Sequence, residues 1–487
     1  MIAALRSEIE ALQQAAAPLE PDAAERAALM DLAFGHAQHF LADLAEGPAN
    51  RRWDEAFADP LDPEFPEAGR DPADALAFLG RAVDGPGITT ASPRFMGYIP
   101  GGGLFHSAIG DFLAAASNKY AGFASAAPGA VRLENATAAW LAEAIGFPAG
   151  AGGTLTSGGS MANLTAIVAA REARDEDGGG AVYLAATAHY CIDKALRIAG
   201  RSKAPRRLIA TDDGYRMCAD ALAEALERDR ADGVRPWLVV ASAGAVDTGA
   251  VDPLARIAAL CAEHGAWFHV DGAYGGLFML CEEGRAALHG IELADTVALD
   301  PHKALFLPYG TGAVVARDAR MLVDAFSASA DYIRPLGESE VGPSPGDLSP
   351  ELTRHFRALR LWLPLQIAGV AAFRAAQSEK IKLARYFHAR MAALDGWETA
   401  PPPDLSVVAF RYVGADGDLD AFNDRLLRHV QEEGRMFLSG TRIGGASWLR
   451  CAILSFRTHL AHIDELIHVL ARAAAALKSN EGTQSAE

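Results

Sequence analysis

The chain has 487 residues, of which 50% are hydrophobic and 22% are charged, and its formal net charge is −18. This composition excludes global disorder, and the acidic balance argues against nucleic acid or an anionic membrane as a partner. No run of about 18 uninterrupted apolar residues occurs, so we expect no membrane span.

The five cysteines are odd in number and include no C-x-x-C pair. They indicate neither a disulfide framework nor a zinc site, so we expect no bound metal. The first residues, MIAALRSEIEALQQAAAPLE, are typical of an amphipathic helix rather than a signal peptide. Together these features favour a reducing, cytoplasmic location.

Residues 1–90 are predicted to form helices interrupted by the stretch at 59–72, which is rich in proline and acids. The apolar periodicity of this segment is too weak for a core of its own. We therefore expect it to lie on another domain or another subunit.

Farther along the chain, strand-like apolar runs alternate with helical patterns. Six strands are expected, with helices between them such as 159–174 and 253–264; the strands are at 180–187, 206–211, 237–244, 266–274, 296–300 and 311–318. This alternation predicts an α/β fold with a mostly parallel sheet that has helices on both faces.

The C-terminal part begins after a loop at 329–351 that is rich in Gly, Pro, Ser and acids. One long helical pattern follows at 352–394, and strands at 405–413 and 447–455 flank a further helix. The expected organisation is therefore an N-terminal helical segment (1–90), a large α/β domain (91–350) and a smaller α+β domain (351–487).

Three chemical features fall together where open α/β sheets bind ligands, at the carboxyl ends of strands. One strand ends in Asp271 within HVDGAY, and another ends in His302–Lys303 within ALDPHK. The third feature is a Gly-rich turn with Ser160 that leads into a helix, whose free N–H groups favour a phosphate. Taken singly, these are an ordinary helix cap, a turn residue and a surface lysine.

Taken together, the three features fit pyridoxal 5′-phosphate (PLP). A lysine is needed to form an imine with the aldehyde, and partial burial is expected to lower the pKa of Lys303. A carboxylate such as Asp271 keeps the pyridine nitrogen protonated, so that the ring accepts electrons. The turn at 158–160 would hold the phosphate tail.

An ordered set of motifs resembles the group II PLP-dependent amino-acid decarboxylases of fold type I, the aromatic-amino-acid and glutamate decarboxylase family, over roughly residues 90–460. The motifs are PRFMGYIPGG, PGAVRLENATAAWLAEAIGFP, TSGGSMANLTAIVAAR, AHYCIDKALRIAG, HVDGAYGG, DPHK and RHFRALRLWLPL. The resemblance implies a mostly parallel seven-stranded sheet and a smaller C-terminal α+β domain. It also implies a homodimer with active sites at the interface, embraced by the N-terminal helices.

The resemblance further implies roles for individual residues. Lys303 would carry the cofactor, Asp271 would pair with its pyridinium nitrogen, and His189 would stack on its ring and contact the substrate carboxylate. The other implied cofactor contacts are Gly159, Ser160, Thr248, Ala273, Asp300 and His302. The implied substrate pocket contains Phe95, Tyr98, Ile99 and Pro100; with Phe105 these favour an aromatic or hydrophobic amino acid. Two arginines are expected at a helix or subunit interface, Arg354 and Arg357.

Two departures from the family pattern leave alternatives open. Ala245 and Val246 follow Gly244 where many relatives have threonines, so the candidate hydroxyl moves to Thr248. Many members also have a loop tyrosine that protonates the substrate carbon, but residues 335–351 contain none, and Tyr332 precedes them. In this family, loss of that tyrosine is linked to oxidative deamination that gives an aldehyde. We therefore expect an L-amino-acid decarboxylase, with an aldehyde-forming enzyme and a catalytically inactive binding protein as alternatives.

Overall fold

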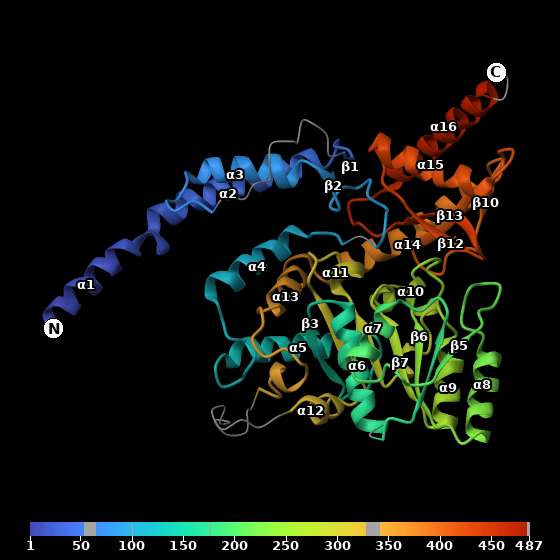
Figure 1. The fold of residues 1–487 in the computed structure, drawn as a ribbon, viewed down its shortest axis with the longest axis horizontal. Coiled ribbons are helices and arrows are strands. Elements are labelled where there is room, and N and C mark those ends of the chain that lie inside the picture. The colour runs from blue at the N-terminus through green and yellow to red at the C-terminus, as the bar shows by residue number, and fades with distance from the viewer. Residues whose placement is uncertain (53–64, 100, 176, 328–340, 485–487) are drawn as a thin grey trace.

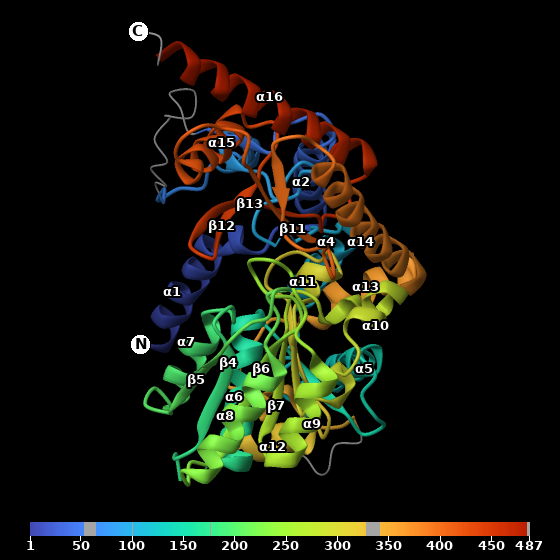
Figure 2. The same ribbon diagram turned by 90° about the vertical axis from the view of Figure 1, so that its right-hand side faces the viewer.

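A computed structural model describes residues 1–52, 65–99, 101–175, 177–327 and 341–484. These residues form a large α/β body, a smaller C-terminal sheet with its own helices, and an N-terminal helical arm (Figure 1). In Figure 2 the C-terminal sheet lies above the large sheet. Within the described residues, no helix is long and apolar enough to cross a membrane.

The large sheet has seven strands in the order β3-β9-β8-β7-β6-β4-β5. Only β9 runs antiparallel to its neighbours, so the mostly parallel seven-stranded sheet is confirmed. Its strands are β3 (Gly152–Thr156), β4 (Ala181–Ala185), β5 (Arg206–Ile209), β6 (Pro236–Ser242), β7 (Trp267–Gly272), β8 (Thr296–Leu299) and β9 (Gly312–Ala316).

Six of these strands match predicted runs, whereas β3 was not predicted. Its sequence, GGTLT, is short and begins with two glycines, which weakens a strand pattern. The structure explains the second glycine, because a Cβ at Gly153 would lie 2.0 Å from the Val314 carbonyl oxygen of β9. The close approach of the β3 and β9 backbones therefore requires glycine at this position, although glycine has a low strand propensity.

Helices cover both faces of the large sheet, and alternate strand residues point to opposite faces. On β4, Val182 and Leu184 pack with one set of helices, whereas Tyr183 and Ala185 belong to the core on the other face. Burial on both faces explains why these strands read as continuous apolar runs. The first face is covered by α6 (Gly159–Arg174) and α7 (Cys191–Ile198), and the second by α5 (Pro128–Ala144), α8 (Ala219–Ala231) and α9 (Leu254–His264).

The C-terminal sheet is antiparallel, with the order β10-β11-β13-β12. Its strands are β10 (Trp397–Thr399), β11 (Val407–Tyr412), β12 (Ser439–Ile443) and β13 (Ala446–Ala452), and its helices are α14 (Val370–Ala392), α15 (Leu419–Glu433) and α16 (Leu460–Gln484). This sheet and its helices form the C-terminal body. The segment that contains Met96 packs with it, because the Met96 N–H donates to the Phe437 carbonyl (2.9 Å) and the Ala452 N–H donates to the Met96 carbonyl (2.8 Å).

The single helical pattern predicted at 352–394 is two helices, α13 (Ala358–Ala368) and α14. They are separated at Gly369, whose φ of 75° is a left-handed conformation that ends a helix. The apolar pattern continues across this break and so conceals it. Of the predicted loop at 329–351, the part from 341 onward is described and contains a short turn of 3-10 helix, Pro345–Asp347.

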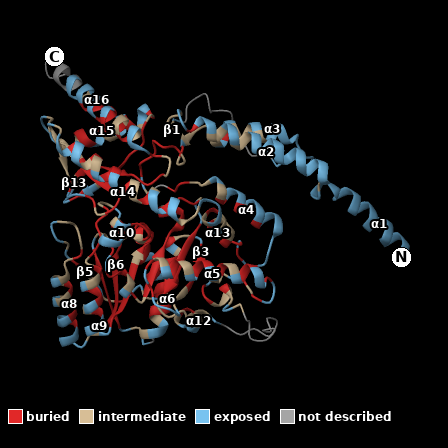
Figure 3. Ribbon diagram, turned by 180° about the vertical axis from the view of Figure 1, so that it is seen from behind, coloured by how far each residue is buried: buried red, intermediate tan, exposed pale blue. Residues whose placement is uncertain are grey.

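The N-terminal arm contains α1 (Ile2–Ala15), α2 (Ala23–Asp43) and α3 (Pro72–Leu79). None of these helices has a buried residue, and Figure 3 shows them almost entirely in the exposed colour. A short pair of strands, β1 (Asn50–Arg51) and β2 (Gly87–Ile88), connects the arm to the rest of the chain. The arm therefore has no core of its own.

Candidate active site

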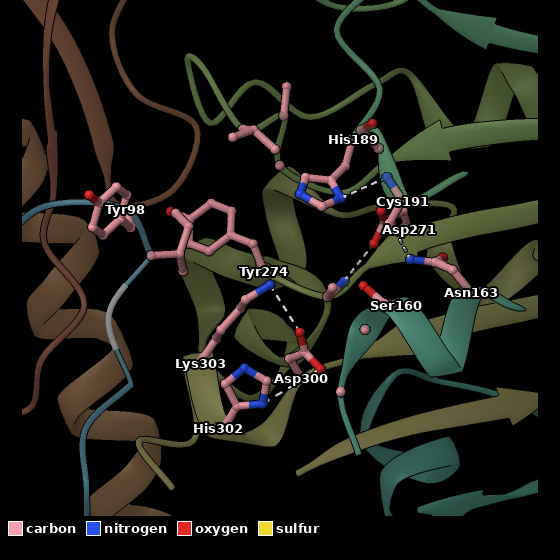
Figure 4. Close-up of a pocket in the computed structure, with 18 of the residues that line it drawn as sticks. Tyr98, Ser160, Asn163, His189, Cys191, Asp271, Tyr274, Asp300, His302 and Lys303 are labelled. Carbon is pink, nitrogen blue, oxygen red and sulfur yellow. Dashed lines mark hydrogen bonds and ion pairs between the residues drawn. The ribbon is translucent and has the colours of Figure 1, made fainter. Parts of the chain in front are cut away.

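A cavity of about 660 Å³ opens at the carboxyl ends of the parallel strands, between the large sheet and the C-terminal sheet. Among the predicted residues it brings together Tyr98, Ile99, Gly159, Ser160, His189, Asp271, Ala273, Asp300, His302 and Lys303. Figure 4 shows Lys303, Asp300 and His302 clustered on one side of it, with His189 and Asp271 facing them. Residues distant in the sequence thus meet at the edge where open α/β sheets bind ligands.

Lys303 lies in α11 (Pro301–Ala304), a single helical turn that follows β8 directly. Pro301 occupies the first helical position, where a missing N–H is harmless. The Lys303 Nζ is 2.9 Å from Asp300 Oδ2, and the lysine side chain is 23% exposed while that of Asp300 is 3% exposed. The sequence DPHK thus turns the chain sharply and points the amine into the cavity.

The electrostatics of Lys303 correct one expectation. Burial lowers its pKa, but the adjacent Asp300 and the more distant Asp271 raise it by more, so that the net shift is upward. The prediction of a lowered pKa is therefore wrong. It considered burial alone, whereas Asp300 is both close enough and buried enough to stabilise the ammonium form.

The turn before α6 forms a cradle with room for a phosphate. A Cβ at Gly159 would lie 2.8 Å from Asp300 Oδ2 and 2.9 Å from the Ala273 Cβ, so only glycine fits there. His302 contacts the Thr311 carbonyl through Nδ1 (2.7 Å), and Asp300 Oδ1 is buried without a hydrogen-bond partner. The first N–H groups of α6 lack intrahelical partners, so the turn at Gly159 and Ser160 fits the phosphate of PLP, whereas the Asp300 carboxylate only accepts hydrogen bonds and offers no donor to it.

Asp271 and His189 form the opposite side of the cavity. Asp271 Oδ1 accepts a hydrogen bond from the Ala273 N–H (3.2 Å). His189 Nδ1 accepts one from the Cys191 N–H (3.2 Å), which leaves the proton of the neutral ring on Nε2. Burial lowers the pKa of His189, and Lys303 lowers it further, against the opposing effect of Asp271 and Asp300.

A buried polar chain lies beneath Asp271 on the same face of β7. His269 is fully buried, with its Nε2 2.7 Å from Asn163 Oδ1 and its Nδ1 2.9 Å from Thr296 Oγ1. Burial lowers the pKa of His269 to about 4, although Asp271 acts in the opposite direction. The imidazole is therefore neutral at pH 7, and it holds the strand that carries Asp271.

Several predicted residues lie elsewhere. Thr248 does not line the cavity, because its hydroxyl turns back and accepts from the Ala250 N–H (3.3 Å). Phe95 is 1% exposed and stacks on Phe437, with ring centroids 5.5 Å apart, so it supports the pocket from behind. Phe105 begins α4 (Phe105–Ser117) on the surface. Pro100 and Tyr332 lie outside the described residues.

The two arginines expected at an interface also lie outside the cavity. Arg354 forms a buried ion pair with Glu134 of α5 (2.7 Å) and donates to Thr154 Oγ1 of β3 (3.0 Å). Arg357 pairs with Glu351 through both of its terminal nitrogens, each at 2.8 Å. Both side chains therefore hold elements of the same chain together.

Sequence reasoning missed Arg450, which reaches the cavity from β13 and is 3% exposed. Its Nη1 donates to the Tyr98 carbonyl and to Ser439 Oγ, whereas its Nε and Nη2 are buried without partners. Burial lowers its pKa. A lone arginine in an alternating strand pattern gives no signal in the sequence, because only the fold brings β13 to the cavity.

Tyr274 was also overlooked, although it lies within HVDGAY. Its hydroxyl is 2.8 Å from Ser406 Oγ and accepts from the Ser406 N–H (2.8 Å), which ties the cavity wall to the C-terminal body. Its ring occupies the space beside Gly244, where a Cβ would lie 2.4 Å from the Tyr274 ring. Burial raises the pKa of Tyr274 to about 12, so the hydroxyl stays protonated.

The cavity offers an amine, a carboxylate and a helix N-terminus at the edge of an α/β sheet, a set that fits a cofactor with an aldehyde, a ring nitrogen and a phosphate. Comparison with known proteins agrees. The model of the pyridoxal-dependent decarboxylase conserved domain matches residues 61–413. An aromatic-L-amino-acid decarboxylase of Bacillus atrophaeus is 35% identical over 437 residues, which cover 88% of this chain and 90% of that protein.

Other relatives extend this result. A phenylacetaldehyde synthase of Petunia hybrida is 28% identical, over 87% of this chain and 90% of its own. The crystal structure of Oryza sativa TDC with PLP and tryptamine superposes with a TM-score of 0.88 at 25% identity, over 94% of this chain and 99% of the other. The chain therefore belongs to the pyridoxal-dependent decarboxylase family, and its cofactor is PLP.

Proposed function

We propose that the protein is a PLP-dependent carboxy-lyase that converts an aromatic or hydrophobic L-amino acid into the corresponding amine and CO₂. The observation that carries this proposal is the meeting of Lys303, Asp271 and the Gly159–Ser160 turn in one cavity. An amine for the aldehyde, a carboxylate for the ring nitrogen and a cradle for the phosphate are the three contacts that PLP needs. When bound, PLP accepts the electron pair that remains when CO₂ departs.

Different residues of the chain hold different parts of the cofactor. Lys303 provides the amine, and Asp271 holds a proton on the ring nitrogen through its carboxylate. Gly159, Ser160 and His302 would bind the phosphate, and the neutral His189 would cover one face of the ring. Asp271 lies near the end of β7, His302 and Lys303 lie in the helical turn after β8, and Gly159 and Ser160 begin α6, so the backbone fixes their positions.

The proposed substrate contacts lie on the side of the cavity that the C-terminal sheet and the segment at Tyr98 form. Arg450 offers Nε and Nη2, two groups without partners in a buried site, and an arginine in that setting favours a carboxylate. We therefore propose that Arg450 orients the α-carboxylate of the substrate. Tyr98 and Ile99 add an aromatic and an aliphatic surface to the same cavity. These surfaces, together with the aromatic-amino-acid decarboxylase among the relatives, support an aromatic or hydrophobic side chain.

A second outcome is supported by one specific observation, the absence of tyrosine from residues 335–351. Without a proton donor there, the enzyme could use O₂ and water to convert the amino acid into an aldehyde, CO₂, ammonia and hydrogen peroxide. The phenylacetaldehyde synthase among the relatives supports this alternative. A catalytically inactive binding protein is the third possibility, and the intact set of Lys303, Asp271 and His189 argues against it.

We also propose a homodimer. The arm has apolar residues on α2 that remain 40–51% exposed, namely Leu29, Met30, Leu32 and Phe34. A second exposed apolar set lies on α4 and α13, namely Ile109, Phe112, Leu113, Trp362 and Ile367. Burial of both sets against a second copy would remove this surface from water.

The division into residues 1–90, 91–350 and 351–487 remains our proposal for the domains. The two sheets and the arm support it, although the segment near Met96 packs with the C-terminal sheet. We propose a cytoplasmic location, which is supported by five free cysteines, four of them buried.

The test of the proposed function is a screen of the twenty L-amino acids with the PLP-loaded protein, in which CO₂, amine, aldehyde and peroxide are measured together. We expect CO₂ and amine in equal amounts from one or a few aromatic substrates. Aldehyde with an equal amount of peroxide would replace the proposal by its alternative. Absence of turnover with all twenty amino acids would contradict both proposed activities, the one that forms an amine and the one that forms an aldehyde.

A further inference from the structure

Gln377 of α14 reaches across from the C-terminal body to the turn that carries Lys303. Its side chain is fully buried, and its Nε2 donates to the Ala304 carbonyl (2.9 Å) and to the Leu277 carbonyl (3.1 Å). Ala304 is the last residue of α11 and the neighbour of Lys303. Leu277 lies in the 3-10 helix η4 (Gly276–Leu280), which follows β7 and Asp271.

The Ala304 carbonyl needs such a donor. A helix leaves its last carbonyl groups without intrahelical partners, and α11 is only one turn long. Within α11 and the residues that follow, the Leu305 N–H donates to the Pro301 carbonyl and the Phe306 N–H to the Lys303 carbonyl. The Gln377 amide therefore satisfies a carbonyl at the end of this turn that the local backbone leaves open.

The same helix supports the next part of the turn. Phe306 is buried with a φ of 61°, a left-handed conformation that is unfavourable for a bulky residue. Its ring stacks on Phe373, with centroids 6.5 Å apart and planes 12° apart. Phe373 and Gln377 are four residues apart, so they project from one face of α14. One face of this helix thus holds both the end of α11 and the strained residue behind it.

Packing alone does not account for a glutamine at this position. Its Oε1 is buried without a partner, and a buried amide oxygen in that state destabilises the folded protein. An apolar side chain of similar size would fill the space without this penalty. The two donated hydrogen bonds are what the glutamine adds.

We propose that Gln377 is a positioning residue for Lys303. By fixing the carbonyl at the end of α11, it holds the lysine amine at the place and angle from which it carries the cofactor, and it couples the C-terminal body to that amine. The inference rests on the proposed role of Lys303.

The test compares Gln377→Leu with Ser378→Ala in the PLP-loaded protein. Ser378 also joins α14 to the large body, through Glu283 of α10 (Glu282–Ala287) at 2.9 Å, but it does not contact the lysine turn. We expect Gln377→Leu to speed release of the cofactor about tenfold and to shift the pH midpoint of its visible absorption band. Ser378→Ala should lower the thermal midpoint without either change. If Gln377→Leu lowers only the thermal midpoint, Gln377 is merely structural and the proposal is wrong.

A second variant keeps the test decisive if Gln377→Leu does not fold. The carboxyl group that Gln377→Glu introduces can donate to the Ala304 carbonyl only when it is protonated. Relative to the unchanged protein, cofactor release should therefore slow as the pH falls through the titration of that carboxyl. A ratio that does not change with pH would contradict the proposal.

Lys303→Ala, measured in parallel, distinguishes failure of the positioning role from failure of the proposed function. Loss of the absorption band in Lys303→Ala, with normal release in Gln377→Leu, overturns only the positioning role. A band that persists in Lys303→Ala overturns the proposed function itself.

Discussion

The two walls of the cavity hold their polar side chains in different ways. On the wall formed by the large sheet, Asp271, His189 and His302 each have a hydrogen bond to a nearby backbone group. On the wall formed by the C-terminal sheet, Arg450 is held through Nη1 by the Tyr98 carbonyl, but its other two nitrogens, both donors, lack partners. The first wall is preorganised for a group that stays bound, whereas the second keeps donors free for a molecule that enters and leaves. This difference predicts that variants of the first wall affect the cofactor and variants of the second affect the substrate.

The largest effect is expected from Lys303→Ala. Loss of the amine removes the covalent link to the cofactor, so the visible absorption band should disappear and CO₂ release should fall at least about 10³-fold. Absorbance of the purified variant after addition of PLP, together with a CO₂ assay, measures both. Lys194 is also a lysine of the large body, but it does not line the cavity, so Lys194→Ala should leave both unchanged.

Asp271→Asn should have the next largest effect. The amide cannot hold the ring nitrogen protonated, so kcat should fall about 10²–10³-fold while the cofactor stays bound. Kinetics with the best substrate and the content of bound PLP test the two parts separately. An unchanged kcat would remove Asp271 from the mechanism.

Arg450→Met tests the second wall. Loss of the guanidinium should raise KM for the amino acid about tenfold or more, because a charge-assisted contact with the carboxylate disappears. The inhibition constant of the amine product, which lacks that carboxylate, should change little, and so should the absorption band. Arg442→Met is the matched control, since Arg442 lies on the neighbouring β12 with 64% of its side chain exposed. Equal weakening of amino acid and amine would contradict the proposed contact.

The smallest effect concerns the support beneath Asp271. Burial lowers the pKa of His269 to about 4, whereas an unfolded chain binds the proton near pH 6.5. The unfolded state therefore binds more protons between these values, and stability should decrease as the pH falls through this window, by up to about 3 kcal/mol. Urea unfolding from pH 7 to pH 4 measures this slope, and His269→Asn should reduce it. An identical slope in that variant would show that other groups cause it.

The two walls also differ in how well the sequence predicts them. Asp271 lies at the end of a strand of strong apolar character, His302 and Lys303 follow another, and Ser160 lies in the first turn of a helix, so local pattern and chemistry agree. Arg450 stands alone in its strand and becomes visible only when β13 is placed beside Tyr98. Gln377 likewise lies within a helical pattern that gives no indication of the lysine turn.

Errors of detail have physical causes that are specific to their positions. The strand β3 was missed because close backbone contact requires Gly153, and the break at Gly369 was missed because apolar residues continue on both sides. The pKa of Lys303 was predicted in the wrong direction because burial and a buried carboxylate have opposite effects, and only the distance to Asp300 decides between them. Thr248 has the expected hydroxyl, but its loop turns that group inward.

The most direct test of the account is chemical identification of the lysine that holds the cofactor. The PLP-loaded protein is reduced with borohydride, digested, and its peptides are sequenced by mass spectrometry. We predict a single pyridoxyl modification, located on Lys303. A modification on any other lysine, or none at all, would contradict the central claim.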